Sequence, residues 1–88
     1  MSTELIHVGF GNILAMDKVL AIVSPGSAPI KRMVQAGKDK GLLIDLTSGR
    51  KTKAVIIMDS GYIVLVALNA ETIASRVAAS RSGGAKPD

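Results

Sequence analysis

The core of this chain has to be built from aliphatic side chains. Phe10 and Tyr62 are its only aromatic residues, whereas 48% of the 88 residues are hydrophobic and most of these are Val, Ile, Leu and Ala. A chain of this length buries roughly 60–65% of its unfolded surface on folding, which suits one domain rather than two. Its apolar area is large enough to offset the entropy lost on ordering. We therefore expect one folded domain that hides its remaining apolar surface by self-association.

The sequence lacks the residues that most enzyme and metal sites require. It has no cysteine and one histidine, His7, which lies in an apolar, strand-like segment, so a thiolate site, a catalytic triad or a histidine-rich zinc site is not expected. Leu14 replaces the third glycine of the dinucleotide-binding fingerprint, and Arg50 stands where a phosphate loop needs lysine. We therefore predict no enzymatic activity, no metal, no cofactor and no small-molecule substrate.

The beginning of the chain, Met1–Glu4, carries an acidic residue and lacks the basic segment that opens a signal peptide. No uncharged apolar run reaches the length of about 18 residues that a membrane span requires. A cytoplasmic location without membrane contact is expected.

Side-chain alternation predicts strands in the first quarter of the chain. Ile6, Val8 and Phe10 share one face of a strand over residues 5–10. The glycines in the Gly9–Asn12 step then interrupt this strand and suit a bend, a bulge or a close backbone approach. A second β-rich run covers residues 13–23, and a polar pair near its middle divides it into two short strands joined by a turn.

Cap and turn residues predict the remaining elements. Ser27 is suited to cap a helix that Gly41 closes, and Asn69 caps a second helix. Between them a strand over 42–46 and a hairpin turning at 59–61 are expected. This order predicts an α+β domain over residues 1–80, with a mostly antiparallel sheet and two helices, followed by a flexible tail over 81–88.

Positive charge is concentrated in the middle of the chain. The net charge is +4, and residues 31–53 hold seven cations against two acids. The cations are Lys31, Arg32, Lys38, Lys40, Arg50, Lys51 and Lys53. Three of them lie in a glycine-containing loop between two hydrophobic strands, where they can reach phosphates, and Arg50 can also bind the edge of guanine with two hydrogen bonds. A solvated basic face without a partner is the alternative interpretation.

The first predicted helix combines apolar and basic positions. Ile30, Met33 and Val34 are expected in the core or in a subunit interface. Lys31 and Arg32 would either line the basic surface or pair with acids of a neighbouring subunit, and the sequence leaves both open.

Several segments in fixed order resemble the bacterial RemA family of extracellular-matrix regulators, over about residues 5–78. These segments are His7–Ile13, Ile22–Pro25, Ser27–Arg32, Gly41–Asp45, Gly49–Val55 and Glu71–Ala74. The resemblance implies a DNA-binding transcriptional regulator that activates biofilm-matrix genes and assembles into rings of identical subunits. It also implies that Lys18, Arg50 and Lys51 bind DNA. From the charge pattern itself, Lys53, Lys31 and Arg32 are further candidates for the DNA-binding surface.

The chain departs from the family pattern at some of these positions. The family typically has arginine where this chain has Lys18 and Lys51, asparagine where it has Asp17, and an aromatic residue where it has Ser48. Charge is kept, but planar two-pronged recognition is left to Arg50. Lys18 also has a second interpretation, an ion pair with neighbouring acids in a turn.

Two other functions stay open at this stage. One is a structural or interaction module that oligomerises and binds a protein through the same surface, and the other is an enzyme with a polar pocket that the sequence does not locate. RNA is a less suitable partner than duplex DNA because only two aromatic residues are available for base stacking and neither lies in the basic loop.

Overall fold

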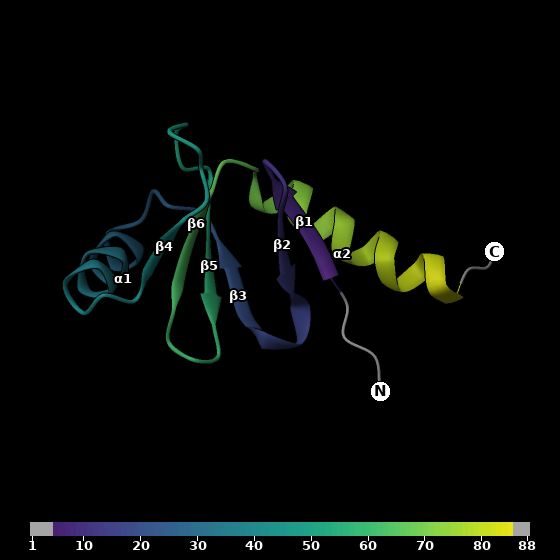
Figure 1. Cartoon of the computed structure of the whole chain (residues 1–88), viewed down its shortest axis with the longest axis horizontal. Coiled ribbons are helices and arrows are strands. Elements are labelled where there is room, and N and C mark those ends of the chain that lie inside the picture. The colour runs from purple at the N-terminus through teal and green to yellow at the C-terminus, as the bar shows by residue number, and fades with distance from the viewer. Residues whose placement is uncertain (1–4, 86–88) are drawn as a thin grey trace.

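A computed structural model describes residues 5–85, which form two small sheets and two helices (Figure 1). The elements in chain order are β1 (Leu5–Gly9), β2 (Asn12–Ala15), the 3-10 turn η1 (Met16–Lys18), β3 (Val19–Val23), α1 (Ala28–Asp39), β4 (Leu43–Asp45), β5 (Ala54–Met58), β6 (Ile63–Val66) and α2 (Ala70–Ala85). The predicted α+β class with mostly antiparallel pairing and two helices is confirmed.

The strands divide into a hairpin and a four-stranded sheet. β1 and β2 pair with each other, and the larger sheet has the strand order β3-β5-β6-β4. The predicted hairpin is present, with β5 and β6 antiparallel from Ala54 opposite Val66 to Ile57 opposite Ile63. β4 is parallel to β6, and β5 is antiparallel to β6. The 47–53 loop therefore reverses the direction of the chain between β4 and β5.

The core lies where the hairpin, the central strands and α2 meet. Its fully buried members are aliphatic, as the composition requires: Ile6, Val8, Ala54, Ile56, Val64, Val66 and Ile73. Burying one large aliphatic side chain contributes about 1.5–3 kcal/mol, so this cluster fixes β5 and β6 under the hairpin. α2 packs against β1 and β3, on the opposite side of the four-stranded sheet from α1 in Figure 1.

Helix α1 begins and ends where its sequence predicts. The Ser27 hydroxyl accepts a 3.4 Å hydrogen bond from the backbone N–H of Ile30, and Gly41 takes a positive φ of +74° just after the helix. Gly37 is buried against β6, because a Cβ atom at this position would lie only 3.0 Å from the Cγ1 atom of Ile63. The missing side chain lets the helix approach the sheet closely.

One strand prediction is wrong in a way that matters for the site. Phe10 does not share the buried face of Ile6 and Val8, because the pairing register shifts between His7 and Gly9. Phe10 then takes a left-handed φ of +54°, and half of its surface is exposed. At the other end of the chain, α2 continues to Ala85, and residues 86–88 of the expected tail lie outside the described residues.

Candidate nucleic-acid interface

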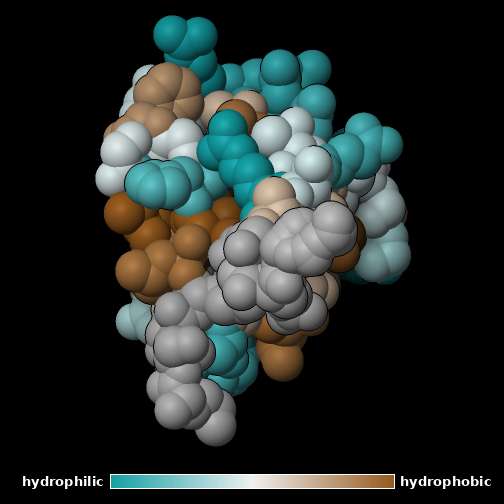
Figure 2. Space-filling model, turned by 90° about the vertical axis from the view of Figure 1, so that its right-hand side faces the viewer, coloured by the Kyte–Doolittle hydropathy of each residue, from teal (hydrophilic) through white to brown (hydrophobic). Residues whose placement is uncertain are grey.

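The two ends of the four-stranded sheet differ in what they carry. The loop end comprises the 47–53 loop, the β1–β2 turn and the β6–α2 connection, which lie together at the top of Figure 1. The turn end comprises η1 and the β5–β6 turn at the bottom of that view. Hydrophilic side chains gather at the top of the molecule in Figure 2, which keeps the same vertical axis.

Strand β6 holds both ends of the basic loop. The backbone N–H of Leu46 donates to the carbonyl of Leu65 over 2.9 Å, and the N–H of Lys53 donates to the carbonyl of Val66 over 2.9 Å. Because β4 and β5 lie on opposite sides of β6, the loop crosses the end of β6 and is held to it on both sides. Its cations therefore stand on a short support with fixed ends.

An aspartate secures the base of the loop. The Asp45 Oδ1 atom accepts from the hydroxyl of Thr47 over 2.6 Å and from its backbone N–H over 2.9 Å. These hydrogen bonds lower the pKa of Asp45 below its ordinary value of 3.8, because they favour the ionised carboxylate. Thr47 is buried and Asp45 is exposed, so the pair joins the exposed end of β4 to a buried residue at the start of the loop.

A tight turn then directs Arg50 outward. The backbone N–H of Arg50 donates to the carbonyl of Thr47 over 3.0 Å, and the two residues between them, Ser48 and Gly49, have φ values of +54° and +81°. Two positive φ angles at the centre of a turn are typical of type I′. Such a conformation is uncommon for serine, which has a Cβ atom, and ordinary for glycine.

The β1–β2 turn repeats this backbone pattern. Phe10 and Gly11 take φ values of +54° and +78°, and the Asn12 Nδ2 atom donates to the Gly9 carbonyl over 3.0 Å. A Cβ atom on Gly9 would lie 3.6 Å from Leu68, so the turn sits directly on the β6–α2 connection. This placement fixes the hairpin turn beside the basic loop.

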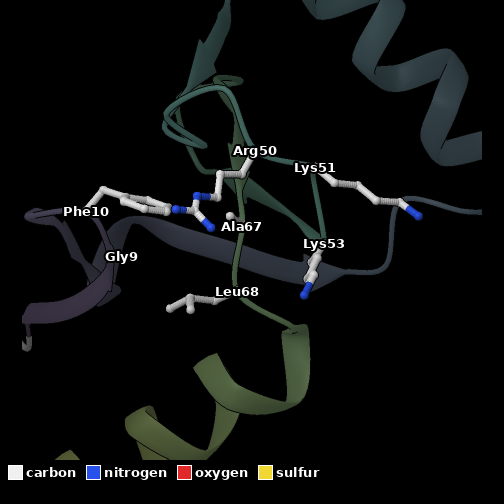
Figure 3. Close-up of a pocket in the computed structure, with 7 residues that line it drawn as sticks. All are labelled: Gly9, Phe10, Arg50, Lys51, Lys53, Ala67 and Leu68. Carbon is white, nitrogen blue, oxygen red and sulfur yellow. The ribbon is translucent and has the colours of Figure 1, made fainter.

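The two turns meet through one side-chain contact. The Arg50 guanidinium carbon lies 5.4 Å from the centre of the Phe10 ring, within the range of a cation–π interaction (Figure 3). Both residues line an open hollow of about 520 Å³, together with Lys51, Lys53, Gly9, Ala67 and Leu68. Figure 3 shows Arg50 directed toward Phe10, whereas the side chains of Lys51 and Lys53 extend away from it.

Lys18 lies at the turn end, away from the loop. Its carbonyl accepts a 2.7 Å hydrogen bond from the N–H of Asp59, which follows β5, whereas the loop precedes β5. The six residue steps from Lys53 to Asp59 amount to roughly 20 Å at about 3.3 Å each. One copy of the chain therefore does not bring Lys18 next to Arg50 and Lys51.

The predicted residues of α1 fall into different surroundings. Lys31 lines a smaller hollow with Val34 and Thr52, so it borders the loop end, and Arg32 is exposed. Ile30 and Val34 are half-buried, whereas Met33 is 37% exposed. Their assignment to the core or to a subunit interface stays a prediction.

Sequence reasoning missed three residues of this site: Phe10, Asp45 and Thr47. The glycines on either side of Phe10 carried a signal, because they are typical of a turn rather than of a strand face. The spacing of Asp45 and Thr47 is that of a carboxylate that binds the backbone two residues on, a common way to start a turn.

Two kinds of site are absent from the part of the chain that the structure describes. Residues 5–85 contain no group of three or more His, Cys, Asp or Glu side chains placed to hold a metal ion. No helix in the same range is long and apolar enough to cross a membrane.

Comparison with known proteins places the chain among bacterial regulators. The family model "RemA-like: Extracellular matrix regulatory protein A-like" matches residues 5–77. A Dehalococcoides mccartyi protein to which a regulatory role is ascribed is 61% identical over 88 residues, covering all of this chain and 92% of the relative. Extracellular matrix regulatory protein A of Bacillus subtilis is 53% identical over 77 residues, covering 88% of this chain and 86% of the relative.

These findings define a small α+β regulatory protein. The chain belongs to the RemA-like family, as its sequence motifs predicted. The family is named for regulation and not for a catalysed reaction.

Proposed function

We propose that this protein binds duplex DNA through its loop end, as a homo-oligomer without enzymatic activity, and so regulates transcription. The observation that carries the proposal is the position of Arg50. This residue stands on a loop that is fixed at both ends, and it faces an open hollow. None of the side-chain hydrogen bonds among the described residues involves its guanidinium group. Its N–H donors are therefore available to phosphates and guanine edges.

Self-association would give this surface its strength. Affinity for a duplex grows with the number of phosphates neutralised, and one loop offers three cations, Arg50, Lys51 and Lys53. Repeating the loop around a ring would multiply those contacts along a bent duplex. Large hydrophobic side chains that are 48–69% exposed, Leu5, Ile13 and Leu20, offer apolar area that a second copy would cover.

The same assembly would give Lys18 a place in the interface. Because Lys18 lies at the turn end, its contact with the DNA that Arg50 binds needs a neighbouring copy or a path along the length of the sheet. Lys31, beside the loop, would extend the basic surface, with Arg32 further along α1.

The regulated genes are proposed from the relatives. The Bacillus subtilis relative is named as a regulator of the extracellular matrix. By that likeness we propose that this protein activates biofilm-matrix genes. We propose a cytoplasmic location for it.

The test is fluorescence anisotropy of a labelled random duplex across a salt series. We compare the wild type with Arg50→Ala/Lys51→Ala and with Lys38→Ala/Lys40→Ala, a control that removes the same charge from the far end of α1. Binding should fall steeply with salt and be lost in the loop variant, with the control close to wild type. Light scattering should give a mass of several chains for all three proteins.

Two outcomes would overturn the proposal. Absence of DNA binding at low salt by a folded, assembled protein would favour the interaction module that binds a protein partner. Equal losses in the two double variants would show that net charge, rather than the loop, determines binding.

A further inference from the structure

The β1–β2 turn places an aromatic ring where the core does not use it. Phe10 is 50% exposed, in a chain with a single other aromatic residue, Tyr62. It also occupies a left-handed φ of +54°, a conformation that costs a side-chain-bearing residue free energy and that glycine would take more easily. Packing against Ile6 and Val8 does not explain its presence, so a role at the surface has to.

The position of the ring is fixed by its neighbours. Gly9 lies against Leu68, and the Asn12 side chain closes the turn onto the Gly9 carbonyl over 3.0 Å. The ring therefore stands on the hairpin and the β6–α2 connection, independently of the basic loop. The 5.4 Å contact with Arg50 links two segments that are far apart in sequence.

An aromatic face restrains an arginine without consuming its hydrogen-bond donors. The ring attracts the cation through its electron-rich face, whereas the five N–H groups of guanidinium lie in the guanidinium plane. Restricting the rotamers of a long side chain before binding lowers the entropy that binding would otherwise cost. Lys51 and Lys53 extend away from the ring in Figure 3 and have no such restraint from it.

We infer that Phe10 is a positioning residue for DNA binding, whose ring holds the Arg50 guanidinium in the orientation that meets the duplex. This inference rests on the proposed function and adds to it a second segment, the β1–β2 turn, that prepares the binding surface. It also assigns Arg50 a different role from the neighbouring lysines, which contribute charge.

The test is a double-mutant cycle with a rescue variant. Phe10→Leu and Phe10→Tyr are each made in the wild type and in Arg50→Ala, and duplex affinity is measured by anisotropy across a salt series. Phe10→Leu should weaken binding about two- to fivefold for each loop in contact, the strength of an exposed cation–π pair. The slope of log affinity against log salt should not change, because no charge is removed. Phe10→Tyr, which keeps an aromatic face, should restore the affinity.

The Arg50→Ala background separates positioning from direct contact. There Phe10→Leu should have no further effect, because the cation that the ring holds is gone. Wild-type affinity in Phe10→Leu, or an undiminished loss in the Arg50→Ala background, would overturn the inference. A thermal melt of each variant identifies an affinity loss that comes from unfolding. Absence of DNA binding by the wild type would instead refute the proposed function itself.

Discussion

The loop end and the turn end of the sheet both carry cations, but only the loop end supports one of them with contacts from several elements. At the loop end, two backbone bonds to β6, the Asp45–Thr47 pair and the Phe10 ring act on a single short loop. At the turn end, the contact near Lys18 is a backbone bond from Asp59 to its carbonyl, and its side chain is exposed. A cation contributes most when its position is fixed before the partner arrives.

The cations at the two ends also differ in what they contribute, since some supply charge and one can recognise a planar partner. Lys18 and Lys51 carry positive charge, and a lysine ammonium acts on phosphates as a compact point charge. Arg50 alone combines a planar group, a fixed support and an aromatic neighbour. We therefore expect Arg50 to dominate affinity, whereas Arg50 and the lysines all contribute to the salt dependence.

The largest effect is expected at Arg50. Arg50→Ala should weaken duplex binding about 10- to 100-fold, since a hydrogen-bonded charged group contributes about 1.5–3 kcal/mol. Arg50→Lys should restore the salt slope but only part of the affinity, because the two-pronged geometry is lost. Anisotropy with random duplex provides both quantities. Full affinity in Arg50→Lys would mean that the loop end binds DNA by positive charge alone.

The next effect concerns the base of the loop. Asp45→Ala removes the acceptor of the Thr47 hydroxyl and N–H. A buried polar group that is left without a partner costs about 1–3 kcal/mol. We expect a loss of about 1–2 kcal/mol in chemical denaturation and weaker DNA binding, although a negative charge has been removed. Stronger binding than wild type would mean that charge outweighs the loop's fixed shape.

A smaller effect is expected at the turn end. Lys18→Ala should weaken binding about two- to fivefold and reduce the salt slope by roughly one contact for each copy engaged, because it removes a charge without a fixed geometry. Light scattering should show the same assembly as the wild type. A loss as large as that of Arg50→Ala would contradict the distinction between the two ends.

The smallest effect is a pH dependence from Asp45. Its pKa is lowered in the folded state by the Thr47 hydrogen bonds, so the stabilisation is present above the ordinary value of 3.8 and is lost as the pH falls through the folded value. The free energy of unfolding should therefore decline below about pH 4, and Asp45→Asn should decline less. Denaturation curves at several acidic pH values measure this, and identical declines would show that Asp45 gains nothing from Thr47.

Local signals predicted the local structure well. Ser27 and Gly41 mark the two ends of α1, because capping depends on the residue itself. The 59–61 turn lies between β5 and β6 for the same reason. The basic loop was also predicted, because a segment with three cations between two apolar strands is expected to be an exposed loop. The parallel pairing of β4 with β6 was not predicted, since it depends on contacts between segments distant in sequence.

The partner of Arg50 could not be predicted for a similar reason. Alternation placed Phe10 on the face of Ile6 and Val8, but a register shift and a left-handed turn moved it to the surface. Packing between segments distant in sequence, such as that of Gly9 on Leu68, places that turn beside the loop. Lys18 shows the reverse case, because the resemblance grouped it with Arg50 whereas the single chain keeps them at opposite ends.

The most direct test of the loop end as the DNA-binding surface is hydrogen exchange of the assembled protein, followed by mass spectrometry, with and without saturating duplex. We predict that DNA slows exchange most in peptides covering residues 48–53 and 9–12, and less in those covering 16–18 and 59–62. Protection confined to the turn end, or none in either region while DNA is bound, would contradict the account.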